Sequence, residues 1–353
     1  MNFASSETDD IMSETIVRFA AEELRPRLRE FEAAGCVSAD LHARFEALGF
    51  AAVDLPEDCG GTGLGLGGRL RLNRLLAEAD AGAALALDRF GPAVYVVEAF
   101  GSRDLLKRYL DLLASRPELR LALVIDPDSV SASEGPVRGK AAWIASGRAD
   151  ILVGLDRAGA WVLESGFEIK AVRGAALHAA GASSVRYEGK PTRAWHDPML
   201  AARALAKIRL YHAGLIWGVV ADAAGFSRRY ALDRVAFGKP IAHHQALAFL
   251  IVDMHVAVER VGLLIEDAAR RIDAGEDGTV AAASAFVDAI EASRFVGPNA
   301  VQILGGHGFM RDYPVEKAMR DCRALGLLGG GLDAAQDDAA AELASANALE
   351  IAA

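Results

Sequence analysis

Apolar positions repeat with a helical period through the first third of the chain. Between residues 14 and 113 they recur at steps of three and four, as in Ile16, Phe19 and Leu24. This spacing predicts helices that each bury one face. Glycines and a proline interrupt the pattern at residues 54–67, which predicts an ordered loop there because proline cannot continue a helix.

The pattern changes between residues 119 and 193. Short apolar runs bounded by Gly, Pro and Asp replace the long helical repeat. They lie at residues 119–125, 141–145, 151–155, 160–163, 167–172 and 184–187. Runs of this length and spacing predict a small antiparallel β domain.

Helical periodicity returns from residue 198 onward. One broad apolar stripe predicts a helix that packs into a bundle or a subunit interface. Its members are Leu247, Leu250, Ile251, Met254, Val258, Val261, Leu264 and Ile265. The chain is therefore predicted to be mainly α with a small β domain, divided into an N-terminal helical domain (1–117), a middle β domain (118–195) and a C-terminal helical domain (196–353).

Composition restricts the classes of function. The 353 residues are 52% hydrophobic and carry a formal net charge of −10. They can bury a large core, and they would be repelled by nucleic acid or an anionic membrane surface. The acidic first residues lack the pattern of a signal peptide, and no apolar run has membrane length. Three cysteines without ligand spacing predict reduced thiols in a cytoplasmic protein without structural zinc.

Two short segments carry candidate binding residues. In the segment 234–245, Arg234 offers a forked set of donors suited to a pyrophosphate, and Gln245 can both donate and accept. In the segment 300–309, Gly305 and Gly306 let a ligand approach the backbone, and Gln302 can bond to it. Each segment also has a purely structural explanation. The first can be a helix–helix connection with a surface arginine, and the second can be a glycine-rich helix C-terminus. Neither segment is a GxGxxG turn after a strand, which disfavours a Rossmann site.

Three motifs occurring in order resemble the acyl-CoA dehydrogenase family over nearly the whole chain. They are Arg234-x-x-Phe-Gly-Lys-x-Ile-x-x-x-Gln245, Gln302-Ile-Leu-Gly-Gly-x-Gly, and Tyr313-Pro-Val-Glu-Lys-x-x-Arg-Asp321. The segment from Leu55, Leu-Pro-Glu-Asp-Cys-Gly-Gly-Thr-Gly-Leu-Gly, looks like that family's N-terminal loop. The resemblance implies a helical, β, helical chain ending in a four-helix bundle, and a FAD held across two subunits.

The resemblance divides the FAD site into an intact half and an altered half. Residues matching the family's ADP-binding positions are all present, with Arg234 at the pyrophosphate; they are Arg234, Phe237, Gln245, Gln302, Gly305 and Gly306. At the flavin end, Ile125-Asp126-Pro127 replaces the family's Thr-Glu-Pro turn, and Ala145 replaces a threonine. Trp143 is retained there and can stack on a ring or belong to the core.

The family's catalytic base is a glutamate that removes the α-proton of an acyl-CoA. The best register places Gly329 at its usual position and Ile208 at its alternative position. Asp333 is a possible substitute, although it also fits the start of a helix. Loss of general-base catalysis typically costs about 10²–10⁴ in rate.

Three hypotheses follow from this pattern. In the first, the chain is a subunit of a heteromeric, heterotetrameric FAD-dependent acyl-CoA dehydrogenase and completes the ADP half of a FAD site on a homologous catalytic partner. The resemblance makes a steroid side-chain CoA a possible substrate and an electron-transfer flavoprotein a possible acceptor. In the second, it is a homotetrameric enzyme with a relocated base such as Asp333. In the third, it is a flavin-free assembly or regulatory protein.

Overall fold

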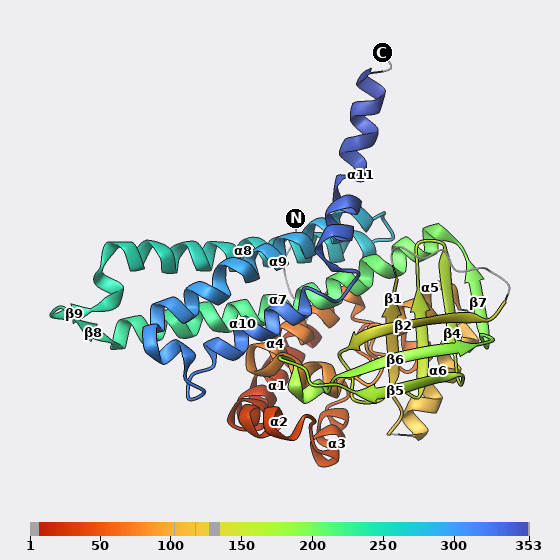
Figure 1. The fold of residues 1–353 in the computed structure, drawn as a ribbon, viewed down its shortest axis with the longest axis horizontal. Coiled ribbons are helices and arrows are strands. Elements are labelled where there is room, and N and C mark those ends of the chain that lie inside the picture. Colours follow the sequence, from red (N-terminus) through yellow and green to blue (C-terminus); the bar gives the residue numbers. More distant parts are fainter. Residues whose placement is uncertain (1–6, 102, 117, 127–134, 352–353) are drawn as a thin grey trace.

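The chain forms helices at both ends and strands in the middle (Figure 1). A computed structural model describes residues 7–101, 103–116, 118–126 and 135–351. The order of elements agrees with the mainly α chain that the sequence predicts. None of the helices in these ranges combines the length and apolar character that crossing a bilayer requires.

The N-terminal part is helical. Its α-helices are α1 (Glu7–Phe19), α2 (Leu28–Ala34), α3 (Ala39–Ala47), α4 (Gly65–Leu87), α5 (Val94–Phe100) and α6 (Arg103–Ser115). The predicted loop is shorter than residues 54–67, because α4 already begins at Gly65. Asp273 explains this start: its carboxylate accepts from the backbone amides of Leu66 and Gly67 at 2.8 and 3.0 Å and satisfies two free N–H groups of the first turn.

The middle part consists of two packed sheets. Its strands are β1 (Leu121–Ile125), β2 (Val137–Ile144), β3 (Ile151–Leu155), β4 (Gly159–Leu163), β5 (Phe167–Ala171), β6 (Ser183–Gly189) and β7 (Arg193–His196). One sheet has the order β1-β3-β4-β7 and the other β2-β6-β5. The predicted antiparallel domain contains one exception, because β1 pairs with β3 in parallel. Strand β7 was not predicted, since its half-exposed and exposed residues give no apolar run.

A small core joins the two sheets. Trp161 of the first sheet and Tyr187 of the second have ring centroids 4.8 Å apart. Strand β3 is buried along its whole length, because one face meets this core and the other meets the helices. The β domain is therefore held against the N-terminal helices and not merely tethered to them.

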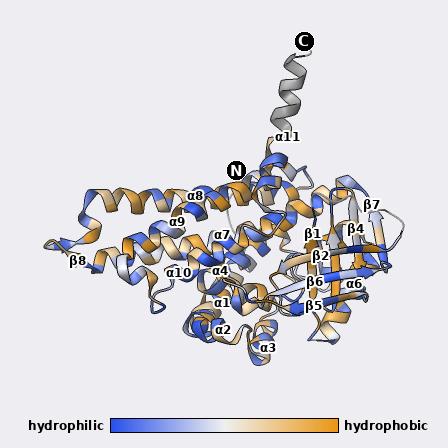
Figure 2. Ribbon diagram, in the orientation of Figure 1, coloured by the Kyte–Doolittle hydropathy of each residue, from blue (hydrophilic) through white to orange (hydrophobic). Residues whose placement is uncertain are grey.

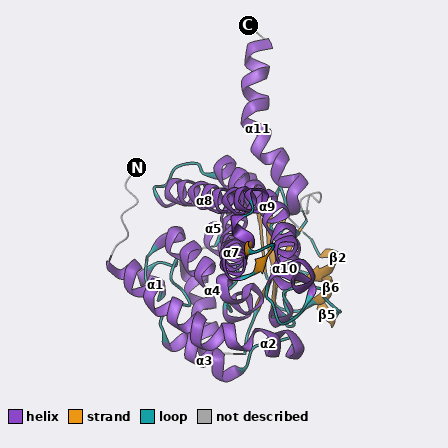
Figure 3. Ribbon diagram, turned by 90° about the vertical axis from the view of Figure 1, so that its left-hand side faces the viewer, coloured by secondary structure: helices purple, strands orange, loops and turns teal. Residues whose placement is uncertain are grey.

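The C-terminal part is built around one long helix. Its helices are α7 (Pro198–Asp233), α8 (Gln245–Asp273), α9 (Thr279–Leu304), α10 (Val315–Leu325) and α11 (Gly331–Ile351), and the hairpin β8 (Val235–Ala236) and β9 (Lys239–Pro240) joins α7 to α8. Figure 3 shows α7 between α4, α8, α9 and α10. Gly218 permits the close approach of α4, because a Cβ there would lie 2.2 Å from the carbonyl oxygen of Arg74.

Helix α8 has two apolar faces. The predicted stripe packs inward, apart from Leu264, which is partly exposed. On the other face Phe249, Val252, Val256 and Leu263 are each more than half exposed, and apolar positions recur along α8 in Figure 2. A run of exposed apolar side chains on one helix marks an interaction surface.

Candidate functional site

A cavity of about 950 Å³ lies where the N-terminal helices, the β domain and the turn before α11 meet. Its wall includes Leu85 and Ala86 of α4, Leu121 and Leu123 of β1, and Leu328. Clefts of this size with mostly apolar walls bind small organic ligands. The cavity corresponds to the flavin end of the site that the family resemblance implies, the half that the sequence predicts to be altered in this chain.

The residues predicted at the flavin end come together on this wall. Ile125, Trp143 and Ala145 all line the cavity, and Trp143 is half-buried against the main core. Pro127, the last residue of the altered turn, lies outside the described residues. Neither Ile125 nor Ala145 carries a hydroxyl group, so these two positions offer a flavin no side-chain hydrogen bond.

No carboxylate lies at either family position for the base. Gly329 lines the cavity, and its carbonyl oxygen accepts from Nε of Arg209 at 3.2 Å. Ile208 is fully buried and is not part of the wall. Asp333 is exposed in the first turn of α11 and is also absent from the wall.

The backbone at Gly329 is unsuited to a side chain. Gly329, Gly330 and Gly331 have φ values of 65°, 87° and 80°, in the left-handed region that favours glycine. A Cβ at Gly329 would lie 3.4 Å from side-chain atoms of Arg209 and Phe286. The space would admit a Cβ, but the backbone conformation disfavours any residue with one.

Three other carboxylates do line the cavity, and each has protein partners. Asp88 accepts from the hydroxyl group of Tyr211 at 2.9 Å, and Glu46 pairs with Arg89. Glu118 is bonded to Arg116 at 3.0 Å. Each of these three carboxylates is therefore held by a partner from the same chain.

The residues predicted at the ADP end gather at the opposite end of α7. Arg234 ends the helix and is exposed, and within the described residues its guanidinium has no partner. Phe237 and Gly238 form a two-residue hairpin turn with φ values of 53° and 80°. A positive φ is costly for phenylalanine, and the ring is 95% exposed. Gln245 is exposed at the start of α8.

The second glycine-rich segment lies at the same end. Gln302, Gly305 and Gly306 are exposed, and a Cβ on either glycine would meet no atom within 4 Å. The segment is fixed to α7 by the hydroxyl group of Tyr230, which lies 2.8 Å from Nδ1 of His307. Open backbone beside an unpaired guanidinium fits the pyrophosphate and ADP portion of FAD.

The two groups of residues are far apart in one chain. His212 of α7 lines the cavity, and the 22 residues from there to Arg234 span about 33 Å at the rise of an α-helix. Figure 1 shows the β8–β9 hairpin at one end of the molecule and the β domain at the other. The ADP-end residues therefore lie far from the chain's own cavity.

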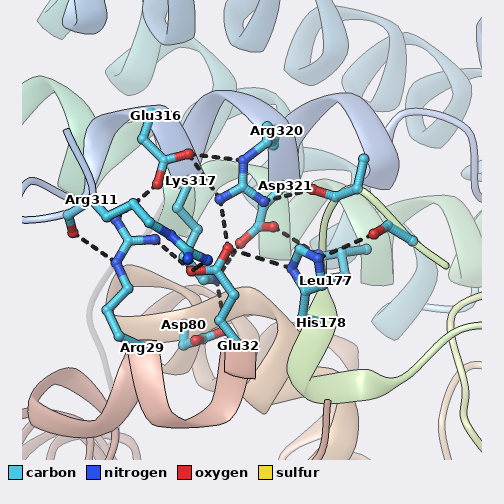
Figure 4. Close-up of polar contacts among 12 residues, drawn as sticks. Arg29, Glu32, Asp80, Leu177, His178, Arg311, Glu316, Lys317, Arg320 and Asp321 are labelled. Carbon is cyan, nitrogen blue, oxygen red and sulfur yellow. Dashed lines mark hydrogen bonds and ion pairs between the residues drawn. The ribbon is translucent and has the colours of Figure 1, made fainter. Parts of the chain in front are cut away.

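The third motif has a structural role. Figure 4 shows Lys317 and Asp321 of α10 beside Asp80 of the kink in α4. The Nζ atom of Lys317 donates to Asp80 at 3.1 Å and to Asp321 at 2.5 Å, and Asp321 accepts from the amide of Leu177. Burial opposes the charge of Lys317, but the two carboxylates outweigh it and raise its pKa. No local pattern predicts this contact, because Asp80 lies more than 200 residues away from Lys317.

A second part of this network surrounds Glu32 of α2. Arg29 and Arg320 both bond to its carboxylate at 2.6 Å. Burial alone would raise the pKa of Glu32, but the two arginines lower it to about 2. Arg320 also donates to the carbonyl oxygen of Ala175. The network therefore ties α10 to α2 and to the β domain.

Comparison with known proteins gives the class of this architecture. The family model "Acyl-CoA dehydrogenase, N-terminal domain" matches residues 6–117, and "Acyl-CoA dehydrogenase, C-terminal domain" matches residues 199–343. Acyl-CoA dehydrogenase FadE12 of Mycobacterium tuberculosis is 32% identical over 81% of this chain and 83% of its own length. The chain therefore belongs to the acyl-CoA dehydrogenase family, whose members are FAD-dependent dehydrogenases of CoA thioesters.

Further relatives and solved structures agree with this family. Acryloyl-CoA reductase (NADH) of Anaerotignum propionicum is 26% identical over 94% of this chain and 93% of its own. The structure of butyryl-CoA dehydrogenase from Megasphaera elsdenii aligns with a TM-score of 0.85 at 22% identity, covering 97% of this chain and 100% of that one. PigA with FAD and proline aligns with a TM-score of 0.86 at 21% identity, covering 98% and 99%. The predicted fold class and family are confirmed.

Proposed function

We propose that this chain is a subunit of a heteromeric FAD-dependent acyl-CoA dehydrogenase. It supplies the ADP half of a FAD site whose flavin ring, base and substrate lie on a homologous catalytic partner. One observation carries the proposal: the ADP-end residues are complete and lie about 33 Å from a cavity in which Gly329 and Ile208 leave no base. FAD, when bound, accepts the hydride equivalent that leaves the acyl group.

The residues of this chain would hold the nucleotide end of that FAD. Arg234 would bind the pyrophosphate, Gln245 and Gln302 would meet the ADP portion, and the open backbone at Gly306 would let it approach. The exposed apolar face of α8 supports the proposal, because Phe249, Val252 and Val256 need a covering surface. A related chain would provide this surface and bring its flavin end to the ADP end of this one.

The substrate and the electron acceptor are part of the proposal. A bulky CoA thioester, such as that of a steroid side chain, would bind on the partner. An electron-transfer flavoprotein would accept the electrons. Two matches have names that mention an electron-transfer flavoprotein. They are Caffeyl-CoA reductase-Etf complex subunit CarC of Acetobacterium woodii, 39% identical over 113 residues, and a structure titled for the electron transferring flavoprotein of Acidaminococcus fermentans.

Flavin content tests the proposal. The chain is expressed alone and together with a homologous acyl-CoA dehydrogenase from the same organism, and FAD is measured by visible absorbance. We expect the chain alone to hold little FAD and to show no acyl-CoA dehydrogenation. We expect the pair to bind FAD and to dehydrogenate an acyl-CoA. Full flavin and normal turnover in the chain alone would favour a homomeric enzyme, and a colourless pair would favour a flavin-free assembly protein.

Arg234→Ala tests the assignment of the ADP end. We expect this variant to lower the FAD content of the pair without unfolding it, because a charge-assisted hydrogen bond contributes about 1.5–3 kcal/mol. Arg186→Ala is the matched control, since Arg186 is an exposed arginine on β6, in the β domain. Equal FAD affinity in the two variants would contradict the assignment.

A further inference from the structure

The glycine-rich turn that carries predicted ADP contacts is tied to α7 through the side chain of His307. The turn is the short 3₁₀ helix Gly305–Phe309. Its glycines contribute no side chain, and Phe309 is 77% exposed. His307 is half-buried, and its Nδ1 atom lies 2.8 Å from the hydroxyl oxygen of Tyr230. Whichever of the two groups donates, this hydrogen bond joins the turn to the end of α7.

The ring of His307 is also held by a second aromatic residue. It stacks on Tyr313, with ring centroids 4.9 Å apart and an angle of 10° between the planes. Tyr230 meets both rings edge-on, with centroid distances of 5.9 Å to His307 and 6.0 Å to Tyr313. Stacked and edge-on pairs are the arrangements that aromatic rings favour. We call these three residues the aromatic clamp.

Both tyrosines of the aromatic clamp are anchored to the body of the protein. Tyr230 lies in the last turn of α7, and its carbonyl oxygen accepts from the backbone amide of Arg234 at 2.9 Å. The loop that carries Tyr313 is held by Arg29 of α2. The guanidinium of Arg29 donates to the carbonyl oxygens of Tyr313 at 2.9 Å and of Arg311 at 2.8 Å. The clamp therefore connects the glycine-rich turn with α2 and with the helix end that carries Arg234.

The turn needs such a connection because its glycines restrain the backbone poorly. A Cβ on Gly305 or Gly306 would meet no atom within 4 Å, so the space that admits a ligand also leaves this side of the turn without packing. Glycine loses more conformational freedom on becoming ordered than any other residue. A ligand that must first order its binding site binds more weakly than a ligand that meets an ordered one.

We propose that His307 is a positioning residue for the ADP half of the FAD site. The aromatic clamp keeps the backbone of Gly305 and Gly306 in place relative to Arg234 before FAD binds. His307 therefore acts on FAD affinity through the turn. The inference rests on the proposed function, because that function assigns the nucleotide end of FAD to this end of α7.

Removal of one hydroxyl group tests the hydrogen bond. Tyr230→Phe keeps the ring contacts and deletes the oxygen that meets Nδ1 of His307. The co-expressed pair is stripped of FAD and titrated with FAD, and flavin fluorescence is followed. We expect the Kd for FAD to rise roughly 3- to 10-fold, the range of one neutral hydrogen bond. Tyr109→Phe is the matched control and should leave the Kd unchanged, since the Tyr109 hydroxyl bonds to Glu164 at 3.0 Å beside the β domain.

A double-mutant cycle shows whether the two side chains act as one unit. His307→Phe keeps a ring that can stack on Tyr313 and removes Nδ1. We expect it to weaken FAD binding about as much as Tyr230→Phe does. We expect the double variant to bind no more weakly than either single variant, because all three lose the same hydrogen bond. Fully additive effects would show that the two residues act independently and would overturn the inference.

Hydrogen exchange of the chain alone gives a readout that needs neither FAD nor a partner. The amide of Met310 donates to the carbonyl oxygen of His307 at 3.0 Å and reports on opening of the turn. We expect Tyr230→Phe to speed exchange in the peptide that covers residues 305–310, and Tyr109→Phe to leave it unchanged, because weakly held backbone opens more often. Equal exchange in Tyr230→Phe and the wild-type chain would contradict a positioning role, even if FAD affinity falls.

Failure of the inference and failure of the proposed function give different results. A wild-type pair that binds no FAD would overturn the proposed function, and the inference with it. A pair that binds FAD, loses affinity with Arg234→Ala and keeps its affinity with Tyr230→Phe would overturn the inference alone.

Discussion

Replacing Lys317 by methionine should strongly destabilise the fold, because it removes the cation that pairs with two buried carboxylates, Asp80 and Asp321. Its ammonium group neutralises Asp80 and Asp321, and the side chains of all three residues are at most 6% exposed. Methionine preserves most of the volume but leaves two buried carboxylates facing each other without a cation. Removing one partner of a buried ion pair typically costs about 3–5 kcal/mol.

The structure shows what the loss would disturb. Asp80 sits at the kink of α4, where its carboxylate accepts from the amide of Ala83 at 3.0 Å and caps the second half of the helix. Asp321 accepts from the amide of Leu177, a residue with a positive φ of 53°. Both contacts are made by carboxylates whose charge Lys317 balances. We therefore expect the kink of α4 and the turn at Leu177 to loosen together.

Urea unfolding followed by tryptophan fluorescence measures this cost. Lys207→Met is the matched control, because Lys207 pairs with Glu98 at 2.8 Å but the two side chains are 26% and 27% exposed. A pair of this kind is worth about 0–1 kcal/mol. If Lys317→Met costs no more than Lys207→Met, the reasoning about buried charge is wrong.

The pH dependence gives a second check on the Lys317→Met variant. Burial is already the largest influence raising the pKa of Asp80, with Lys317 acting against it. Without Lys317 the folded pKa of Asp80 should rise further above the unfolded value. A carboxyl group with a raised folded pKa binds its proton more tightly in the folded state, so lowering the pH from 7 to 5 should recover part of the lost stability. If the destabilisation caused by Lys317→Met is the same at pH 7 and at pH 5, the charge-based explanation is wrong.

Three further outcomes follow from the same contacts. Gly329→Glu should create no dehydrogenase activity in this chain, because its φ of 65° disfavours a side chain and the flavin contacts are missing; steady-state assay of the chain alone checks this. Asp333→Asn should leave turnover per bound FAD of the complex nearly unchanged, since Asp333 is exposed and off the cavity wall, and a loss of turnover with FAD retained would identify it as a relocated base. Glu32 should stabilise the fold by at most about 3 kcal/mol, and this contribution should be lost as the pH falls from about 4.5 to about 2, because its folded pKa is about 2 and its ordinary value is 4.5; Glu32→Gln should remove this part of the acid sensitivity measured by urea unfolding.

Local patterns in the sequence were enough for the helices and most strands. The stripe from Leu247 to Ile265 predicts α8 because a helix places every third and fourth residue on one face, which is a property of the chain itself. The same reasoning failed for β7, whose residues are too exposed to form an apolar run. It also could not predict that β1 and β3 run parallel. These two strands pair in the fold although β2 lies between them in the sequence, and local patterns do not show which strands pair.

The motifs that define the family could be identified in the sequence, but the structural or binding role of each motif residue could not. Arg234 and Gly306 were predicted as binding residues, and the structure places them at one exposed end of the bundle. Lys317 belongs to a motif too, yet its partner Asp80 is brought to it only by the packing of α10 against the rest of the helices.

The cavity was decided by tertiary structure alone. His212 is one more residue in an apolar helix until α4, β1 and the turn at Gly329 are packed around it. Burial then lowers the pKa of His212 to about 4, and the carbonyl oxygen of Ile208 lies 2.9 Å from Nδ1 of the ring. Periodicity is a local property that sequence records directly, whereas a cavity depends on contacts between residues far apart in the chain, which no local pattern encodes.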